Sequence, residues 1–286
     1  MLKQRVITAL VLLAILLPAL LSANPQYFMG LSLLMIAAGG WEWGRLNGRS
    51  SGAAMGGGVL CVLLSVAAIG VGWGLRAPPT LWLVGGSVWV LLGVGMLRTG
   101  VQGWGRVPSV LRWLVGLGLL VVAWLALIRA HRVGVNFLLS VLVLVWAADV
   151  VAYFAGRAFG GRIFRVKLAP AISPGKTWEG AFGGFAGVLL MAFAWLLWDR
   201  QHPGLEPSLH TRLWQQGWWL ALPAWAFLTA MSVVGDLVES LVKRSAGVKD
   251  SSNLLPGHGG VLDRLDALLP TLPLAMMLYS WLELQT

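Results

Sequence analysis

The sequence has little charge and almost no cysteine. Only 11% of its 286 residues are Asp, Glu, Lys or Arg, and only eleven are acidic. A soluble domain typically carries about 25% charged residues, and no polar stretch here is long enough to build one. The single cysteine, Cys61, excludes an intrachain disulfide and a zinc site made of cysteines. Its apolar surroundings predict a small buried side chain.

What the sequence does have is hydrophobicity, because 58% of its residues are apolar. They come in runs of about twenty, the length of helix that crosses about 30 Å of hydrocarbon. Backbone groups in lipid must pair within their own segment, so helices are predicted and not a sheet. The predicted fold class is an all-α, polytopic integral membrane protein. We expect nine spans, at residues 5–22, 26–44, 53–73, 81–97, 110–128, 135–156, 180–198, 215–234 and 262–282.

The first run resembles a signal peptide, but it is slightly long and many spans follow, so an uncleaved first span is favoured. Residues 1–134 are then N-terminal transmembrane helices, about five spans. Residues 135–286 form a C-terminal catalytic transmembrane domain with loops at 157–179 and 235–266.

The net charge of +10 is carried mainly by short connections between apolar runs, as at a membrane surface facing anionic lipid. The sequence has no basic domain that could bind nucleic acid, so nucleic acid is not expected as a partner. With the N-terminus in the cytoplasm, sixteen of the 21 Lys and Arg residues fall on cytoplasmic segments. This asymmetry supports nine spans with the N-terminus inside, and it puts both loops in the cytoplasm.

Five of the eleven acidic residues lie between positions 236 and 266, which is a dense cluster for this chain. If residues 235–245 continue the eighth helix, Asp236, Glu239 and Lys243 share one face. Asp263 and Asp266 are likewise three residues apart. Such carboxylates suit Mg²⁺, which takes one or two carboxylates together with substrate phosphate.

Basic residues alternate with these carboxylates, and a glycine-rich turn, Pro256-Gly257-His258-Gly259-Gly260, lies between them. Glycines let a backbone approach phosphate closely and present its N–H groups. Carboxylates for metal, cations for phosphate and a flexible turn are the parts that phosphoryl-type transfer needs. Solvated residues flanking membrane helices are the plainer interpretation. His258 is open as a general base, a phosphate ligand or a turn residue.

The stretch from Ser240 to Asp266 resembles the signature of the phosphatidate cytidylyltransferase (CDP-diglyceride synthase) family. Every fixed position and gap fits over 27 residues, and Asp236 and Glu239 are similar to the family's approach to this segment. The matching residues are Ser240, Lys243, Arg244, Lys249, Asp250, Pro256, His258, Gly259, Gly260, Asp263, Arg264 and Asp266.

The other loop follows Asp149, an ionisable residue inside an apolar run and therefore a functional candidate. The alternative is a helix-packing residue paired with a nearby arginine such as Arg157. Further on, Ser173 is expected to cap the seventh span, with Pro174 in its first turn and Glu179 near its start.

Ser, Lys and Thr beside a helix N-terminus suit an anion, although the spacing is not that of a P-loop. The segment also resembles the family's Ser-Pro-Asn-Lys-Thr element, which is thought to help hold the nucleotide. Ser173, Lys176 and Thr177 carry over, but Gly175 replaces the Asn, which puts any contact of that side chain in doubt.

The resemblance implies that phosphatidate and CTP react to give CDP-diacylglycerol and pyrophosphate. Mg²⁺ is then expected on Asp236, Asp263 and Asp266, with a second cation left open. Lys176, Lys243, Arg244, Lys249 and Arg264 would clamp phosphates. Catalytic roles extend to Asp250 and His258, and substrate contacts to Asp149, Ser173, Thr177, Glu179, Ser240, Gly259 and Gly260.

The expected location is the inner (plasma) membrane, with the active site facing the cytoplasm and a homodimer left open. Three rival functions remain. A CTP-dependent polyprenol or dolichol kinase shares much of the chemistry. An ion-coupled transporter is disfavoured because the charges gather at one membrane face and not at mid-depth. A non-catalytic scaffold would leave the cluster of carboxylates and cations unexplained.

Overall fold

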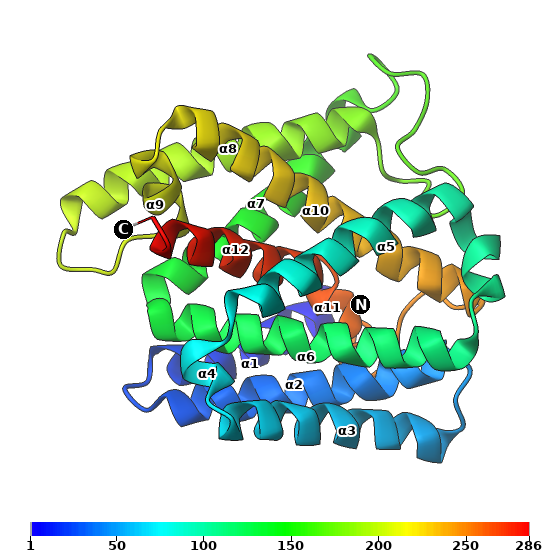
Figure 1. The fold of residues 1–286 in the computed structure, drawn as a ribbon. Coiled ribbons are helices and arrows are strands. Elements are labelled where there is room, and N and C mark those ends of the chain that lie inside the picture. Colours follow the sequence, from blue (N-terminus) through cyan, green and yellow to red (C-terminus); the bar gives the residue numbers. More distant parts are fainter. Residues whose placement is uncertain (1, 286) are drawn as a thin grey trace.

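The computed structural model describes residues 2–285, and within them it is all helical, with no strand beyond two isolated bridges. Figure 1 shows the long helices lying side by side as a bundle. This confirms the all-α part of the predicted fold class for the described residues. The helices are α1 (Leu2–Leu21), α2 (Pro25–Leu46), α3 (Ser51–Gly70), α4 (Trp73–Arg76), α5 (Pro79–Arg106), α6 (Ser109–Val133), α7 (Val135–Phe159), α8 (Trp178–Gln201), α9 (Leu209–Gln215), α10 (Trp218–Ser245), α11 (Leu262–Leu265) and α12 (Leu268–Glu283).

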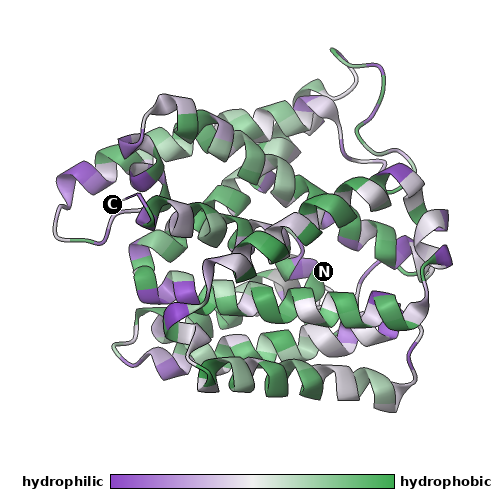
Figure 2. Ribbon diagram, in the orientation of Figure 1, coloured by the Kyte–Doolittle hydropathy of each residue, from purple (hydrophilic) through white to green (hydrophobic). Residues whose placement is uncertain are grey.

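Seven helical stretches in the described chain are long and apolar enough to cross a membrane. They are α3, α5, α6, α7, α8, α10 and the combined stretch Leu262–Glu283. Helices α1 and α2 occupy the first two predicted spans, but α2 is outside the seven and the apolar part of α1 is the shorter Val6–Leu21. Figure 2 shows apolar residues along the helices and hydrophilic ones gathered at their ends and in loops. The molecule is therefore a multi-pass membrane protein by helix length and composition.

Glycines let α7 and α8 pack with their backbones close together. A Cβ added at Gly184 would lie 2.8 Å from the carbonyl oxygen of Ala148, and one at Gly180 would lie 2.9 Å from that of Ala152. Small residues allow such close approach between membrane helices. The approach puts the α7 turn that carries Asp149 beside the start of α8.

The last predicted span is two helices, α11 and α12, separated at Asp266 and Ala267. Pro270 explains the separation, because proline has no N–H and its ring crowds the carbonyl four residues earlier. That carbonyl belongs to Asp266 and lies against α10: a Cβ on Gly235 would be 2.4 Å from it. The contact brings Asp236 of α10 next to Asp266.

The eighth predicted span continues beyond residue 234, since α10 runs without interruption to Ser245. This confirms the expected helical continuation and makes Asp236, Glu239 and Lys243 neighbours on one face. The two longest irregular segments of the described chain are 160–177 and 246–261. Figure 1 shows both segments at one end of the bundle, together with the α2–α3 and α5–α6 connections. The predicted site residues are thus collected at that end.

Candidate active site

A cavity of about 820 Å³ opens among α7, α8, α10 and α11 and the two loops that join them. Both signature-like segments contribute to its wall, as their resemblance to one family implied. Twelve predicted site residues line it: Asp149, Lys176, Thr177, Asp236, Ser240, Lys243, Arg244, Lys249, Asp250, Asp263, Arg264 and Asp266.

Asp236 joins the two segments. Its Oδ2 lies 2.6 Å from Lys176 Nζ, and its Oδ1 accepts a hydrogen bond of 3.2 Å from Ser240, one turn further along α10. Because Lys176 precedes α8, the ion pair connects the loop 160–177 to α10. Among the described residues of this loop, Lys176 is the cation that pairs with a carboxylate, and that carboxylate was predicted to bind metal.

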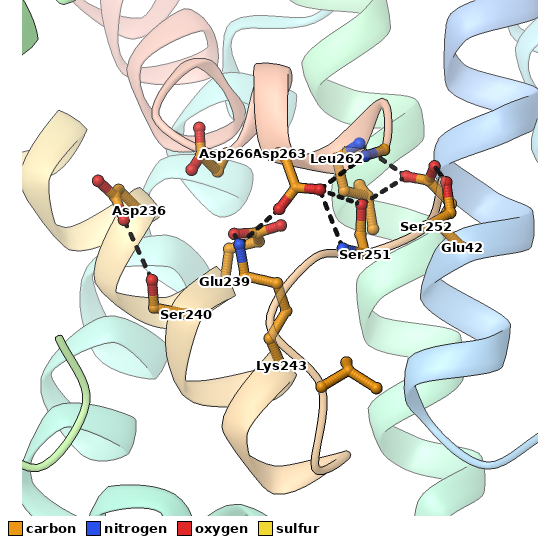
Figure 3. Close-up of polar contacts among 12 residues, drawn as sticks. Glu42, Asp236, Glu239, Ser240, Lys243, Ser251, Ser252, Leu262, Asp263 and Asp266 are labelled. Atoms are coloured by element: carbon orange, nitrogen blue, oxygen red, sulfur yellow. Dashed lines mark hydrogen bonds and ion pairs between the residues drawn. The ribbon is translucent and has the colours of Figure 1, made fainter. Parts of the chain in front are cut away.

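Asp263 is the most heavily bonded carboxylate of the cavity. Its Oδ1 lies 2.5 Å from Lys243 Nζ, which also pairs with Glu239. Its Oδ2 accepts hydrogen bonds from the backbone N–H groups of Ser251 (2.9 Å) and Gly260 (2.7 Å), and from the Ser251 hydroxyl (2.9 Å). Figure 3 shows these contacts. Both oxygens of Asp263 are thus engaged by donors of the chain itself.

Asp266 is held less firmly than its neighbours. Its Oδ1 accepts a hydrogen bond from the next backbone N–H, that of Ala267, at 2.8 Å. It is close enough to Asp236 and Asp149 to be repelled by both carboxylates. No ion pair joins Asp149 to Arg157 in the described chain, where Arg157 contacts the Tyr153 hydroxyl instead. The helix-packing alternative for Asp149 therefore lacks its expected partner.

The carboxylates suit a cation that completes its shell with phosphate and water. Among the residues that the structure describes, no three His, Cys, Asp or Glu side chains form a ready-made metal cage. Mg²⁺ usually takes only one or two carboxylates and keeps several waters beside substrate phosphates. Asp236 and Asp266, which repel each other across α10 and α11, fit this partial donor set.

Four cations of the cavity wall have no carboxylate partner. Arg157, Arg244, Lys249 and Arg264 line the cavity and appear in no ion pair between described residues. Free guanidinium and ammonium groups are the strong hydrogen-bond donors for phosphate oxygens. The cavity therefore combines paired carboxylates with unneutralised positive charge, which suits a polyanionic ligand. Arg157 was considered only as a partner for Asp149, and the structure adds it to the candidate site.

The prediction that Ser173 caps the following helix is wrong. Thr177 is the N-cap, with its Oγ1 accepting the N–H of Gly180 at 3.0 Å, and α8 begins at Trp178. Ser173 closes a turn with Ala169 and Pro174 precedes the first helical turn. Serine and threonine are both common N-cap residues, and serine ranks slightly higher. Packing decides, because the Thr177 side chain lies against Gly156 of α7.

Glu179 is in the first turn of α8, as expected, but it is buried and outside the cavity lining. Its Oε1 accepts the N–H groups of Ile163 (3.1 Å) and Phe164 (3.0 Å). These bonds tie the loop 160–177 to the helix that follows it. Glu179 thus contacts the loop backbone and does not face the large cavity. Ser173, which was also predicted to contact substrate, is likewise outside the lining of that cavity.

The glycine-rich turn lines a second cavity of about 730 Å³. His258 and Gly259 contribute to it, whereas Lys249, Asp250 and Arg264 line both cavities. Gly257 and Gly259 have φ of +77° and +80°, which glycine adopts without strain. The hydroxyl of Thr8 in α1 donates to the carbonyl oxygen of Pro256 at 2.8 Å, so the N-terminal helix contacts this turn.

Sequence reasoning missed Glu42 of α2, whose side chain is completely buried beneath the signature segment. It accepts hydrogen bonds from Ser251, Ser252, Val261 and Leu262. The signal was available, since Glu42 is an ionisable residue within an apolar run, the same criterion that singled out Asp149.

The chain matches the model of a family described as the cytidylyltransferase family over residues 3–282. A phosphatidate cytidylyltransferase of Pseudomonas aeruginosa is 40% identical over 282 residues, covering 96% of this chain and 95% of the relative. One of Haemophilus influenzae is 37% identical over 314 residues, covering 98% and 99%. One of Brucella abortus is 44% identical over 149 residues, about half of each chain.

Proposed function

The chain belongs to the cytidylyltransferase family, and we propose that it transfers the CMP moiety of CTP to phosphatidate, giving CDP-diacylglycerol and pyrophosphate. The observation that carries the proposal is the cavity of about 820 Å³ in which both signature-like segments meet. Relatives named for this activity match nearly the whole chain. The polyprenol kinase and transporter alternatives have no comparable support.

In the proposed reaction, a phosphate oxygen of phosphatidate attacks the α-phosphorus of CTP in line. A new P–O bond forms, and the bond to the β-phosphate breaks to release pyrophosphate. The nucleophile is already ionised at neutral pH, so no protein nucleophile and no covalent intermediate is needed. Two polyanions must meet, and neutralising their charge in a preorganised site is the main catalytic task.

The free cations of the cavity are assigned to the phosphates. Arg157, Arg244, Lys249 and Arg264 have no carboxylate partner in the described chain and can contact phosphate oxygens. Lys176 and Lys243 are paired with carboxylates, so we assign them first to holding Asp236 and Asp263 in place. His258, in the neighbouring cavity, is not required as a base.

Mg²⁺ is proposed at the carboxylates. Asp236 and Asp266 would hold it, because Asp263 already accepts four contacts from Lys243 and the loop. When bound, the ion would supply charge neutralisation for phosphate oxygens and the leaving pyrophosphate. Asp263 would then order the segment that carries Asp266.

We also propose nine spans with the N-terminus, and the catalytic end of the bundle, in the cytoplasm. Both loops and the α2–α3 and α5–α6 connections share that end in Figure 1, and they carry most of the cations. CTP is a cytoplasmic substrate, and the bacterial relatives favour the inner membrane. A homodimer is proposed from the family resemblance, and sedimentation in detergent would measure it.

The test is turnover by the purified protein in detergent with CTP, Mg²⁺ and phosphatidate. CDP-diacylglycerol and pyrophosphate are expected in equal amounts, and Asp263→Ala is expected to abolish both. Asp199→Asn is the control, because Asp199 belongs to a hydrogen-bonded group with Asn136 and Thr211 at the other end of the bundle. No turnover by the parent would overturn the proposal. Transfer of label from the γ-phosphate would favour the kinase.

A further inference from the structure

Glu42 is a buried carboxylate that is compensated entirely by donors of the signature segment. Its Oε1 accepts the Ser252 hydroxyl at 2.5 Å and the Val261 N–H at 2.9 Å. Its Oε2 accepts the Ser251 hydroxyl at 3.1 Å and the Leu262 N–H at 2.7 Å. No Lys, Arg or His of the described chain forms an ion pair with it. Burying a charged carboxylate is costly unless hydrogen bonds compensate it. The four donors therefore have to stay in place for Glu42 to remain buried.

The four donors come from the two ends of one irregular segment. Ser251 and Ser252 begin the stretch 251–262, Val261 precedes α11 and Leu262 is its first residue. One carboxylate of α2 therefore holds the two ends of the segment together, with Asn253 to Gly260 as the loop between them. Figure 3 shows Glu42 on the neighbouring helix with its contacts to this segment. The position of the glycine-rich turn thus depends on a residue about two hundred positions away.

The same segment holds Asp263. The Ser251 hydroxyl lies 3.1 Å from Glu42 Oε2 and 2.9 Å from Asp263 Oδ2, and its single proton can serve only one of them at a time. The N–H groups of Ser251 and Gly260 both donate to Asp263. A Cβ on Gly260 would lie 2.0 Å from Ser251 Oγ and 2.4 Å from Glu42 Oε1. Glu42, Ser251, Gly260 and Asp263 are one closely packed unit.

We infer that Glu42 is a positioning residue for the transfer reaction: it orders the segment 251–262, and through it Asp263 and Lys243, without touching either substrate. Glu42 is absent from the lining of the large cavity, whereas Asp263 and Lys243 are part of it. The kcat measurements of this role rest on the proposed function, whereas the hydrogen-exchange measurement does not.

Glu42→Gln is the decisive variant. Glutamine keeps the shape but replaces one acceptor oxygen by an NH₂ group. A serine hydroxyl can turn to accept from that group, but the N–H of Val261 or Leu262 cannot, so one backbone donor loses its partner. We expect kcat per folded enzyme to fall about 10- to 100-fold, the usual effect of losing a group that orients a site residue. The KM for CTP is expected to change by less than about threefold, because Glu42 is not a substrate contact.

Asp199→Asn is the matched control, since it makes the same carboxylate-to-amide change in a hydrogen-bonded group at the other end of the bundle. It is expected to lower the thermal midpoint but to keep kcat. Ser251→Ala supplies a double-mutant cycle, in which Glu42→Gln costs less in the Ser251→Ala background than in the parent. Parental kcat in Glu42→Gln, or an equal loss in Asp199→Asn, would overturn the inference.

Hydrogen exchange gives a readout that needs no turnover. In the full-length protein in detergent, the backbone N–H groups of residues 261 and 262 should exchange faster in Glu42→Gln than in the parent. Their exchange rates in Asp199→Asn should equal those of the parent. If the parent transferred no CMP but exchange still rose, the proposed function would fail and the ordering role of Glu42 would stand. Unchanged exchange in Glu42→Gln would reject that role.

Discussion

Lys176 Nζ lies 2.6 Å from Asp236 Oδ2, which makes an ion pair between the loop before α8 and the helix α10. The two residues belong to different signature-like segments, and both side chains are only partly exposed. Their pairing means that neither segment forms the site alone. It also means that a change at either residue affects a substrate-facing group and the connection between the two segments.

Replacing Lys176 by Met should therefore lower kcat/KM for CTP about 10- to 100-fold, the usual effect of losing a group that orients a site residue. Lys167→Met is the control. Lys167 lies in the same loop but is exposed, and its Nζ donates to the carbonyl oxygen of Pro174 at 2.7 Å. Surface substitutions of this kind usually change stability by less than about 0.5 kcal/mol. Similar losses in both variants would contradict a specific role for Lys176.

Gly260→Ala should inactivate the protein, because the added Cβ would overlap Ser251 Oγ and Glu42 Oε1. Activity in membranes and the thermal midpoint of the purified variant are the measurements.

Gly175→Asn is the contrasting change, since nothing lies within 4 Å of a Cβ at Gly175. It restores the residue found in the resembling family element, and it should fold normally and keep parental activity or exceed it. An inactive Gly175→Asn would show that the glycine is required here.

Chelation with EDTA should abolish turnover, and added Mg²⁺ should restore it. Asp266→Asn is expected to raise the Mg²⁺ concentration for half-maximal activity about tenfold or more, because it removes one proposed donor. Asp199→Asn, far from the cavity, should keep the parental Mg²⁺ dependence. Full activity in EDTA would reject the metal proposal.

Thiol labelling can test the proposed sidedness. Cys61 is the only cysteine and is fully buried, so Cys61→Ala provides a background without reactive thiols. In intact cells, a membrane-impermeant reagent should label Arg200→Cys but not Arg162→Cys or Lys249→Cys until the cells are broken. Labelling of either of the last two in intact cells would place the site outside the cytoplasm.

Stability should depend on pH through His210, which lies in α9, outside the candidate spans. Complete burial lowers the pKa of its imidazole to about 4, although Nε2 is 3.2 Å from the carbonyl oxygen of Ser140. Between the usual pKa of about 6.5 and about 4, the unfolded chain binds a proton that the folded chain does not. Stability is therefore lost as the pH falls through this window, by up to about 1.4 kcal/mol per pH unit.

The measurement is the thermal midpoint between pH 7.5 and pH 4.5. His210→Asn should show a flatter dependence than the parent, whatever its absolute stability. Equal slopes in the two proteins would mean that His210 does not carry the effect.

Much of the fold could be read from local pattern. Hydrophobicity summed over about twenty residues is a local property, and it located the seven stretches that are long and apolar enough to span. The helical spacing of Glu239 and Lys243 was also sufficient to predict that the two side chains are neighbours. Residues four apart on a helix lie on one face, and the two form an ion pair.

Details that depend on distant backbone could not be predicted. Ser173 and Thr177 are both suitable caps by residue type, and only the packing of α7 against α8 selects Thr177. The division of the last span at Asp266 depends on Pro270 and on its contact with Gly235 of α10. The partners of Asp263 come from α10 and from both ends of a loop whose course has no periodic signal.

Residue type and spacing alone were enough to predict a helical membrane protein and to propose the chemical groups of its site. The packing of the helices sets which of those groups are paired and which cations are left without a carboxylate, and it places Glu42 of α2 against the segment 251–262. The reason is that hydrogen bonds act over about 3 Å between groups that the chain separates widely. Which groups become hydrogen-bond partners is therefore set by how the helices pack.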